Sequence, residues 1–268
     1  MTGTTDTARL PLLLSTLRLP TVARLWPAIG QTADTEGWPA ARTLATLLEH
    51  EVAERANRRT ARHLVEARLP PGKTLDMFDF AAAPMISRAR ITALAQGDSW
   101  LDTGTNILLF GPPGVGKTHL ASALGHALVE AGHRVLFTRT TDLVQQLQTA
   151  RQDLKLAAAI DKLDKYRLLI LDDLSYVQKS QAETSVLFEL ISARYERRSI
   201  LITANQPFGA WDAIFPDPAM TVAAIDRLVH HAIILEMNTD SYRRKTAQAR
   251  AAPPNAAVPP PNAAIDPS

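Results

Sequence analysis

Residues 107–130 read ILLFGPPGVGKTHLASALGHALVE. The run ILLF predicts a buried strand, and the stretch after Thr118 has the composition of a helix. Between them lies a match to G-x-x-x-x-G-K-[ST], the phosphate-binding loop whose glycines allow a tight turn with inward-pointing amides. The loop consists of Gly111, Pro112, Pro113, Gly114, Val115, Gly116, Lys117 and Thr118. We expect it to bind ATP, with Lys117 on the β and γ phosphates and the Thr118 hydroxyl on Mg²⁺.

Two later apolar runs also end in polar side chains. The run LLIL ends directly in Asp172 and Asp173, and the run ILIT is followed two residues later by Asn205. Ligands of open α/β sheets bind at the carboxyl ends of the strands. We therefore expect Asp172 to hold magnesium through water, Asp173 to orient or deprotonate the attacking water, and Asn205 to hold that water. The aspartates could instead cap a following helix, and asparagine is also common before a turn.

Five short apolar runs alternate with helix-like stretches between residue 78 and about residue 250. Continuous Leu, Ile and Val runs of this length indicate strands of a parallel sheet that is buried on both faces. The runs are residues 107–110, 135–138, 168–171, 200–203 and 233–235. The sequence therefore predicts an α/β fold with a parallel five-stranded sheet flanked by helices.

The rest of the chain divides at proline-rich segments. Residues 8–68 carry apolar side chains at helical spacing, and a Pro-Pro-Gly sequence at residues 70–72 ends that pattern, because proline lacks the amide proton that a helix needs. We expect a small all-helical domain at residues 1–70 and the α/β domain at residues 71–250. Residues 251–268 are rich in Pro and Ala and cannot bury enough surface to fold, so a disordered tail is expected there.

The composition is that of a globular protein. The chain has 268 residues, 46% of them hydrophobic, and its net charge of +2 permits contact with nucleic acid without requiring it. The absence of cysteine excludes disulfide frameworks, thiolate nucleophiles and cysteine-based zinc sites. The leucine-rich run at residues 10–19 lacks the basic flank of a signal peptide, and no run reaches the ~20 residues of a membrane helix. We therefore expect a cytoplasmic protein without membrane contact.

Two arginines near the end of the expected folded part are candidates for contact with the transferring phosphoryl group. Arg227 lies in the sequence AIDRL and Arg243 in the sequence DSYR. A guanidinium stabilises the charge that develops on this group, and one supplied by a neighbouring subunit couples hydrolysis to assembly. An ordinary surface ion pair is the alternative for each residue.

Several segments together indicate a family. They are LRLPTVARLW from residue 17, KTLDMFDF from 73, GPPGVGKTHLASALG from 111, LLILDDLSY from 168, ITANQPFGAW from 202, DRLVHHAIIL from 226 and DSYRRK from 240. In these segments the chain resembles the IstB-like transposition helper ATPases of the AAA+ superfamily, which are related to DnaC-type helicase loaders. The phosphate-binding loop is generic, whereas the KTLDMFDF segment and the DRL and SYR sequences near the end are specific.

The resemblance implies a two-part helper protein. Its N-terminal helical domain would engage partners or DNA, and its AAA+ core would form a homo-oligomer on duplex DNA and present that DNA to an IstA-type transposase. Asn205 is similar to the sensor-1 residue of this superfamily, Arg227 to its arginine finger and Arg243 to its sensor-2 residue. The chain has Asp173 where glutamate is commoner in the superfamily.

The resemblance also implies where DNA lies. In related loaders and initiators the segment after the second core strand lines the nucleic-acid path. Here that segment carries Arg139, Arg151, Lys155, Lys162 and Lys165. Such charges contact backbone phosphates with little base specificity, so sequence-tolerant binding of duplex DNA is expected.

Three other functions stay open at this point. A DnaC-like helicase loader in DNA replication would share every motif of the core. A small-molecule kinase could use the same phosphate-binding loop, although the Asn205 position and the SYR sequence have no role there. A protein that uses ATP only as an assembly switch would bind the nucleotide and barely hydrolyse it.

Overall fold

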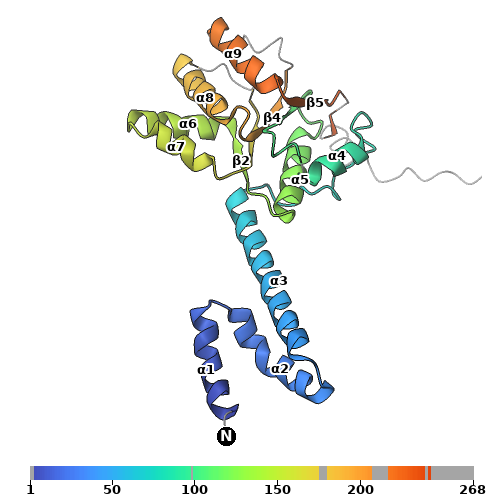
Figure 1. Cartoon of the computed structure of the whole chain (residues 1–268). Coiled ribbons are helices and arrows are strands. Elements are labelled where there is room, and N and C mark those ends of the chain that lie inside the picture. The colour runs from blue at the N-terminus through green and yellow to red at the C-terminus, as the bar shows by residue number, and fades with distance from the viewer. Residues whose placement is uncertain (1–2, 98, 175–179, 207–216, 239–240, 243–268) are drawn as a thin grey trace, which may run out of the picture.

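The computed structural model describes residues 3–97, 99–174, 180–206, 217–238 and 241–242. Within this part the chain forms three N-terminal helices and an α/β core (Figure 1). The helices are α1 (Gly3–Thr16), α2 (Pro20–Glu36), α3 (Ala40–Ala67), α4 (Arg88–Ala95), α5 (Lys117–Glu130), α6 (Thr140–Gln152), α7 (Leu156–Leu163), α8 (Gln181–Arg194) and α9 (Pro218–Val229). The strands are β1 (Asn106–Phe110), β2 (Val135–Arg139), β3 (Leu168–Asp172), β4 (Ser199–Ala204) and β5 (Ala232–Glu236). Each of the five predicted strands is confirmed.

The strands form one parallel sheet in the order β2-β3-β4-β1-β5. In strand β1, Ile107 lies beside Leu201 of β4 on one side and Ile233 of β5 on the other. All strands point the same way, so the carboxyl ends of β1, β3 and β4 meet at one edge of the sheet. That edge is where polar residues follow the apolar runs.

The two faces of the sheet are covered by different helices. Ile107 and Leu109 of β1 belong to a core cluster with Leu120 and Leu124 of α5. The alternate residues of β1, Leu108 and Phe110, point to the opposite face, into a cluster with side chains of α6 and α8. Because successive side chains of a strand alternate between faces, a continuous apolar run fills both cores.

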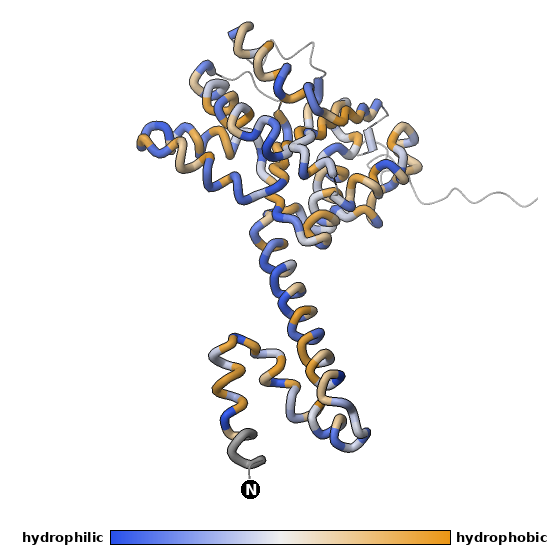
Figure 2. Tube along the Cα trace, viewed as in Figure 1, coloured by the Kyte–Doolittle hydropathy of each residue, from blue (hydrophilic) through white to orange (hydrophobic). Residues whose placement is uncertain are grey.

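The N-terminal helices have a small core of their own, in which Leu14, Val22 and Leu47 pack together. Figure 1 shows α1 to α3 reaching away from the α/β core, with α3 as the connection. The part of α3 beside α2 is largely hydrophobic, and the part between it and the α/β core is largely hydrophilic (Figure 2). None of the described helices combines the length and the apolar character needed to span a membrane.

The Glu51 side chain of α3 caps the first turn of α2. Its Oε2 accepts the amides of Thr21 and Val22 at 2.8 and 3.1 Å, and its Oε1 accepts Nε of Arg55 at 2.9 Å. Burial works to raise the pKa of this carboxyl, but the hydrogen bonds from Arg55 and the two amides outweigh it and lower the pKa. Since the residue before α2 provides no side-chain cap, Glu51 acts as the cap of that helix from a distance in sequence.

The end of α3 is part of the α/β core. Ala67 is fully buried in the same cluster as the α5 side chains, and Glu66 forms an ion pair with Arg134 at 2.8 Å. That hydrogen bond lowers the pKa of Glu66. The division of the chain at residue 70 therefore stays a prediction, because α3 passes from one unit into the other without a break before Ala67.

Candidate nucleotide-binding site

The phosphate-binding loop joins β1 to α5 at the carboxyl edge of the sheet. Gly111 and Gly116 have φ angles of 149° and 102°, which side-chain-bearing residues rarely adopt. A Cβ at Gly111 would lie 2.4 Å from the backbone oxygen of Met237, whose amide donates to the Phe110 oxygen at 2.7 Å. The loop thus needs glycine at its first position both for its conformation and for the close approach of the chain after β5.

Lys117 is held at the centre of the loop. Its Nζ donates to the backbone oxygens of Gly111 and Pro112 at 2.6 and 2.9 Å and to Oδ1 of Asn205 at 2.8 Å. The side chain is only 7% exposed. A buried ammonium that spans the loop matches the role expected of the phosphate-contacting lysine.

Thr118 and Asp172 face each other across the start of α5 and the end of β3. The Thr118 hydroxyl lies 2.9 and 3.1 Å from the two carboxylate oxygens of Asp172. Hard divalent cations such as Mg²⁺ prefer oxygen ligands of these two kinds. The pair therefore fits the magnesium site expected from the sequence.

Asp173 and Asn205 lie next to this pair. Nδ2 of Asn205 donates to Oδ1 of Asp173 at 3.3 Å, while its Oδ1 accepts Lys117. Asp173 has a φ of 65°, a left-handed conformation that turns the chain at the end of β3. A continuous hydrogen-bonded path thus runs from Lys117 through Asn205 to Asp173.

Thr203 of β4, which was not among the site residues expected from the sequence, joins the two aspartates. Its hydroxyl donates to Oδ1 of Asp172 at 2.7 Å and accepts the amide of Asp173 at 2.9 Å. A second threonine, Thr140, donates to the backbone oxygen of Asp172 at 3.0 Å. Thr203 could have been identified as a site residue from the sequence, because it is a polar residue at the carboxyl end of an otherwise apolar strand.

Replacing Thr203 by valine is expected to reduce ATP hydrolysis about tenfold or more. The change nearly keeps the shape of the side chain but removes the hydrogen bond to the buried carboxylate, a loss of roughly 1.5–3 kcal/mol, and about 1.4 kcal/mol corresponds to a tenfold change in rate. Phosphate release at saturating ATP and Mg²⁺ measures the effect. Thr203→Ser keeps the hydroxyl and should retain most activity, and Thr138→Val is the matched control on β2. Equal rates for Thr203→Val and the control would remove Thr203 from the site.

Of the two predicted arginines, the structure describes Arg227. Arg227 on α9 donates from Nη1 to the backbone oxygen of Ala223 at 2.8 Å, and its guanidinium lies 5.1 Å from the ring centre of Phe188 on α8. These contacts are not with the phosphate-binding loop. Arg243, the expected sensor-2 residue, lies outside the described residues.

The five expected DNA contacts differ in how available their charges are. Arg139 and the three lysines 155, 162 and 165 are exposed. Arg151, by contrast, donates to the hydroxyl of Ser185 at 3.0 Å and forms an ion pair with Glu189. The lysines of this segment are therefore better placed for contact with phosphates than Arg151.

Relatives with similar sequences are named insertion sequence ATP-binding proteins. The family model described as IstB-like ATP binding protein matches residues 12–250. An insertion sequence ATP-binding protein of Sinorhizobium fredii is 69% identical over 245 residues, which cover 91% of this chain and 82% of that protein. The insertion sequence IS21 ATP-binding protein of Pseudomonas aeruginosa is 42% identical over 202 residues, covering 75% of this chain and 76% of the relative.

Solved structures share the fold of the core. AMPPCP-bound DnaA from Aquifex aeolicus has a TM-score of 0.55 and 19% identity, over 68% of this chain and 56% of that one. DnaI has a TM-score of 0.51 and 20% identity, over 63% of this chain and 95% of that one. The expected P-loop AAA+ fold is confirmed. Together with the match to the model of IstB-like ATP-binding proteins, this fold makes the chain an ATPase. Because the family match spans most of the chain and one relative is 69% identical over 91% of it, the protein belongs to the family of IstB-like ATP-binding proteins.

Proposed function

We propose that this protein is the DNA-binding helper ATPase of an insertion sequence, which assembles as a homo-oligomer on duplex DNA and assists an IstA-type transposase. The observation that supports the ATP-driven part most directly is the path from Lys117 through Asn205 to Asp173, because it links a phosphate-contacting residue to a candidate base. The names of the relatives, which place them in insertion sequences, support the transposition part.

In the proposed mechanism the chain's own residues hold ATP and position the attacking water. Lys117 and the loop amides bind the β and γ phosphates, and Thr118 with Asp172 would hold Mg²⁺. The bound ion would withdraw charge from the phosphate oxygens. Asp173 accepts the proton of the attacking water, and the Asn205 amide holds that water and the carboxylate in line.

Arg227 is proposed to act on the nucleotide of a neighbouring subunit. Its described contacts are with its own helix and with Phe188, so it is not committed to the phosphate-binding loop of its own chain. An arginine supplied in this way makes hydrolysis depend on assembly.

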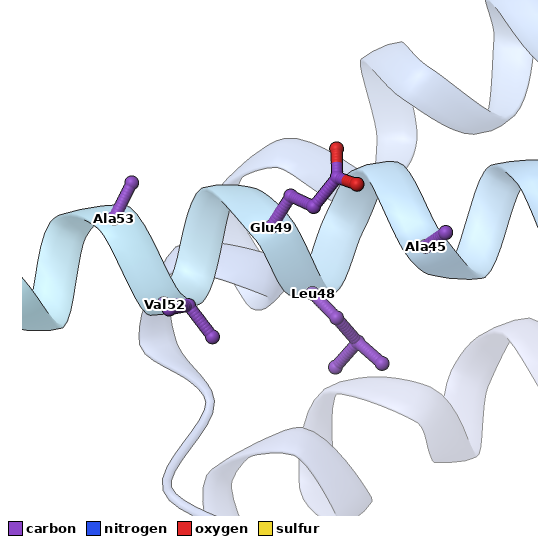
Figure 3. A pocket seen from close by; sticks show the side chains of 5 residues that line it. All are labelled: Ala45, Leu48, Glu49, Val52 and Ala53. Carbon is purple, nitrogen blue, oxygen red and sulfur yellow. The ribbon is translucent and has the colours of Figure 1, made fainter.

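The N-terminal helices are proposed to engage the partner. Exposed apolar side chains gather on α3, where Leu48 and Val52 line a cavity of about 460 Å³ together with Ala45, Glu49 and Ala53. Figure 3 shows Leu48 and Val52 pointing to the same side of the helix. Exposed apolar surface of this kind is typical of protein contact sites. We propose the transposase as the protein that binds there.

DNA binding is expected to depend on the exposed lysines after β2. Replacing Lys155, Lys162 and Lys165 together by alanine should lower the affinity for all duplex sequences alike, because phosphate contacts carry no base information. The slope of log affinity against log salt should flatten by about one per lost contact. Fluorescence anisotropy with two unrelated duplexes at several salt concentrations measures both effects.

The matched control for this experiment is Lys73→Ala, which removes one lysine outside the segment. An affinity loss confined to one of the two duplexes would contradict backbone recognition. Unchanged affinity and slope in the triple variant would move the DNA path to another surface of the protein.

The helicase-loader alternative has less support. The relatives by sequence are insertion sequence proteins, whereas the likenesses to the solved structures are at 19–20% identity and concern the fold alone.

A further inference from the structure

A group of metal-binding side chains lies outside the nucleotide site. Glu196 follows the end of α8, and His230 and His231 join α9 to β5. One potential ligand atom from each of the three residues lies within 4.8 Å of the other two. Among the described residues, this is the group of His, Asp or Glu side chains close enough to hold one metal ion. All three side chains are exposed, each by about half.

The spacing of these atoms matches a metal site better than a set of hydrogen bonds. Oε1 of Glu196 is 3.7 Å from Nδ1 of His230 and 3.6 Å from Nε2 of His231. Hydrogen bonds between such atoms are about 2.7–3.2 Å long. Zn²⁺ binds nitrogen and oxygen at about 2.0–2.2 Å, which places tetrahedral ligands roughly 3.4 Å apart. Small movements of exposed side chains would therefore close the three ligands around an ion.

The backbone that carries the two histidines is fixed by a buried side chain. Nδ2 of Asn106 donates to the oxygen of Leu228 at 3.1 Å, and its Oδ1 accepts the amide of Ile200 at 2.9 Å. The backbone amide of Asn106 donates to the backbone oxygen of His231 at 2.8 Å. One residue thus links the end of α9 to the start of β4, so the histidines are held relative to the segment that follows α8.

The backbone of Glu196 is held equally closely. Its φ of 56° is left-handed, and a Cβ at Gly104 would lie 2.9 Å from its carbonyl carbon. The close packing against Gly104 fixes the turn that directs Glu196 toward the histidines. Ligands on rigid backbone lose little freedom when they bind a metal, which favours binding even at an exposed position.

Tyr195 supplies a neighbouring polar group. Its hydroxyl lies 2.6 Å from Nδ1 of His230, the same nitrogen that faces Glu196. The two rings stack with centroids 6.0 Å apart. A metal on Nδ1 would replace this hydrogen bond, so the tyrosine competes with the metal for that nitrogen.

We propose that Glu196, His230 and His231 form a binding site for Zn²⁺ or a similar transition-metal ion, with the remaining position open to solvent. Imidazole nitrogens with one carboxylate are ligands that suit such ions, in contrast to the oxygen ligands of Thr118 and Asp172. A bound ion would cross-link Glu196, after the end of α8, to the two histidines that connect α9 to β5. This proposal does not depend on the role proposed for DNA or transposase.

Zinc titration of the full chain tests the site. Excess Mg²⁺ is included so that the oxygen ligands of the nucleotide site are occupied. Isothermal titration calorimetry should show one equivalent of bound Zn²⁺, and zinc should raise the melting temperature. His231→Ala should weaken binding about tenfold or more and abolish the shift in melting temperature, since it removes one of three protein ligands. Tyr195→Phe should bind zinc at least as tightly as the natural chain, because the competing hydroxyl is gone.

The matched control is His50→Ala, which removes an exposed histidine from α3 and should leave zinc binding unchanged. Melting temperatures without zinc show whether each variant is folded, and Glu196→Gln provides a second variant that changes only the carboxylate. Zinc affinity and thermal shift that are the same in His231→Ala, Glu196→Gln and the natural chain would overturn the proposal. Weaker binding in Tyr195→Phe would assign the ligand role to the tyrosine and contradict the three-ligand site.

Discussion

Lys117→Ala is expected to lower the affinity for ATP at least about 100-fold. The ammonium is buried in the loop, so its charge-assisted hydrogen bonds with phosphate oxygens would be strong, and two or more such bonds at roughly 1.5–3 kcal/mol each exceed the ~2.8 kcal/mol that corresponds to 100-fold. The alanine also removes the contacts with the oxygens of Gly111 and Pro112 that hold the loop together. Binding of a fluorescent ATP analogue measures the loss, and hydrolysis should fall with it.

The matched control is Lys165→Ala, which removes a lysine at an exposed position away from the loop. Thermal denaturation shows whether the Lys117 variant keeps its fold. Unchanged nucleotide affinity in a folded Lys117→Ala protein would contradict the assignment of the loop.

Arg227→Ala is expected to lower the hydrolysis rate about 10³-fold or more while ATP binding to the isolated chain stays nearly the same. An arginine that acts in trans stabilises charge in the transition state at the neighbouring site and contributes little to ground-state binding. The described contacts of Arg227 are with the backbone oxygen of Ala223 and the ring of Phe188. Phosphate release and ATP affinity, measured separately with duplex DNA present, distinguish the two effects.

Mixing variants tests whether the site is shared between subunits. Lys117→Ala offers an intact Arg227, and Arg227→Ala offers an intact phosphate-binding loop, so their mixture should hydrolyse ATP faster than the sum of the two alone. Arg227→Lys is the control that keeps the charge but loses the planar fork of donors. Activity no greater than the sum, in a protein that stays monomeric with ATP and DNA, would make Arg227 a structural residue of α9.

The sequence by itself determined the α/β class, the five strands and the phosphate-binding loop. These are local properties: continuous apolar runs such as the one at residues 107–110, next to turn residues, are typical of a sheet covered on both faces, and the loop requires glycines at fixed spacing around Lys117. The helical character of residues 8–68 followed from apolar periodicity in the same way.

Only the tertiary structure decided how distant residues meet. The contact between Lys117 and Asn205 spans 88 positions, and the bond from Thr203 to Asp172 spans 31. Such pairs depend on strand order and register, which place β3, β4 and β1 side by side with their carboxyl ends together. Neither the order nor the register is encoded in the spacing of any single motif.

The same reason explains the group formed by Glu196, His230 and His231. In the sequence these residues look like ordinary charged and polar positions after two helices, with Glu196 lying 34 positions before the pair of adjacent histidines. They come together because Asn106, at the start of β1, bonds to the end of α9, to His231 and to the start of β4 through its side chain and backbone. Local pattern determines which elements form, whereas the pairing of buried strands determines which side chains share a site, since only packing fixes the distances between residues far apart in the chain.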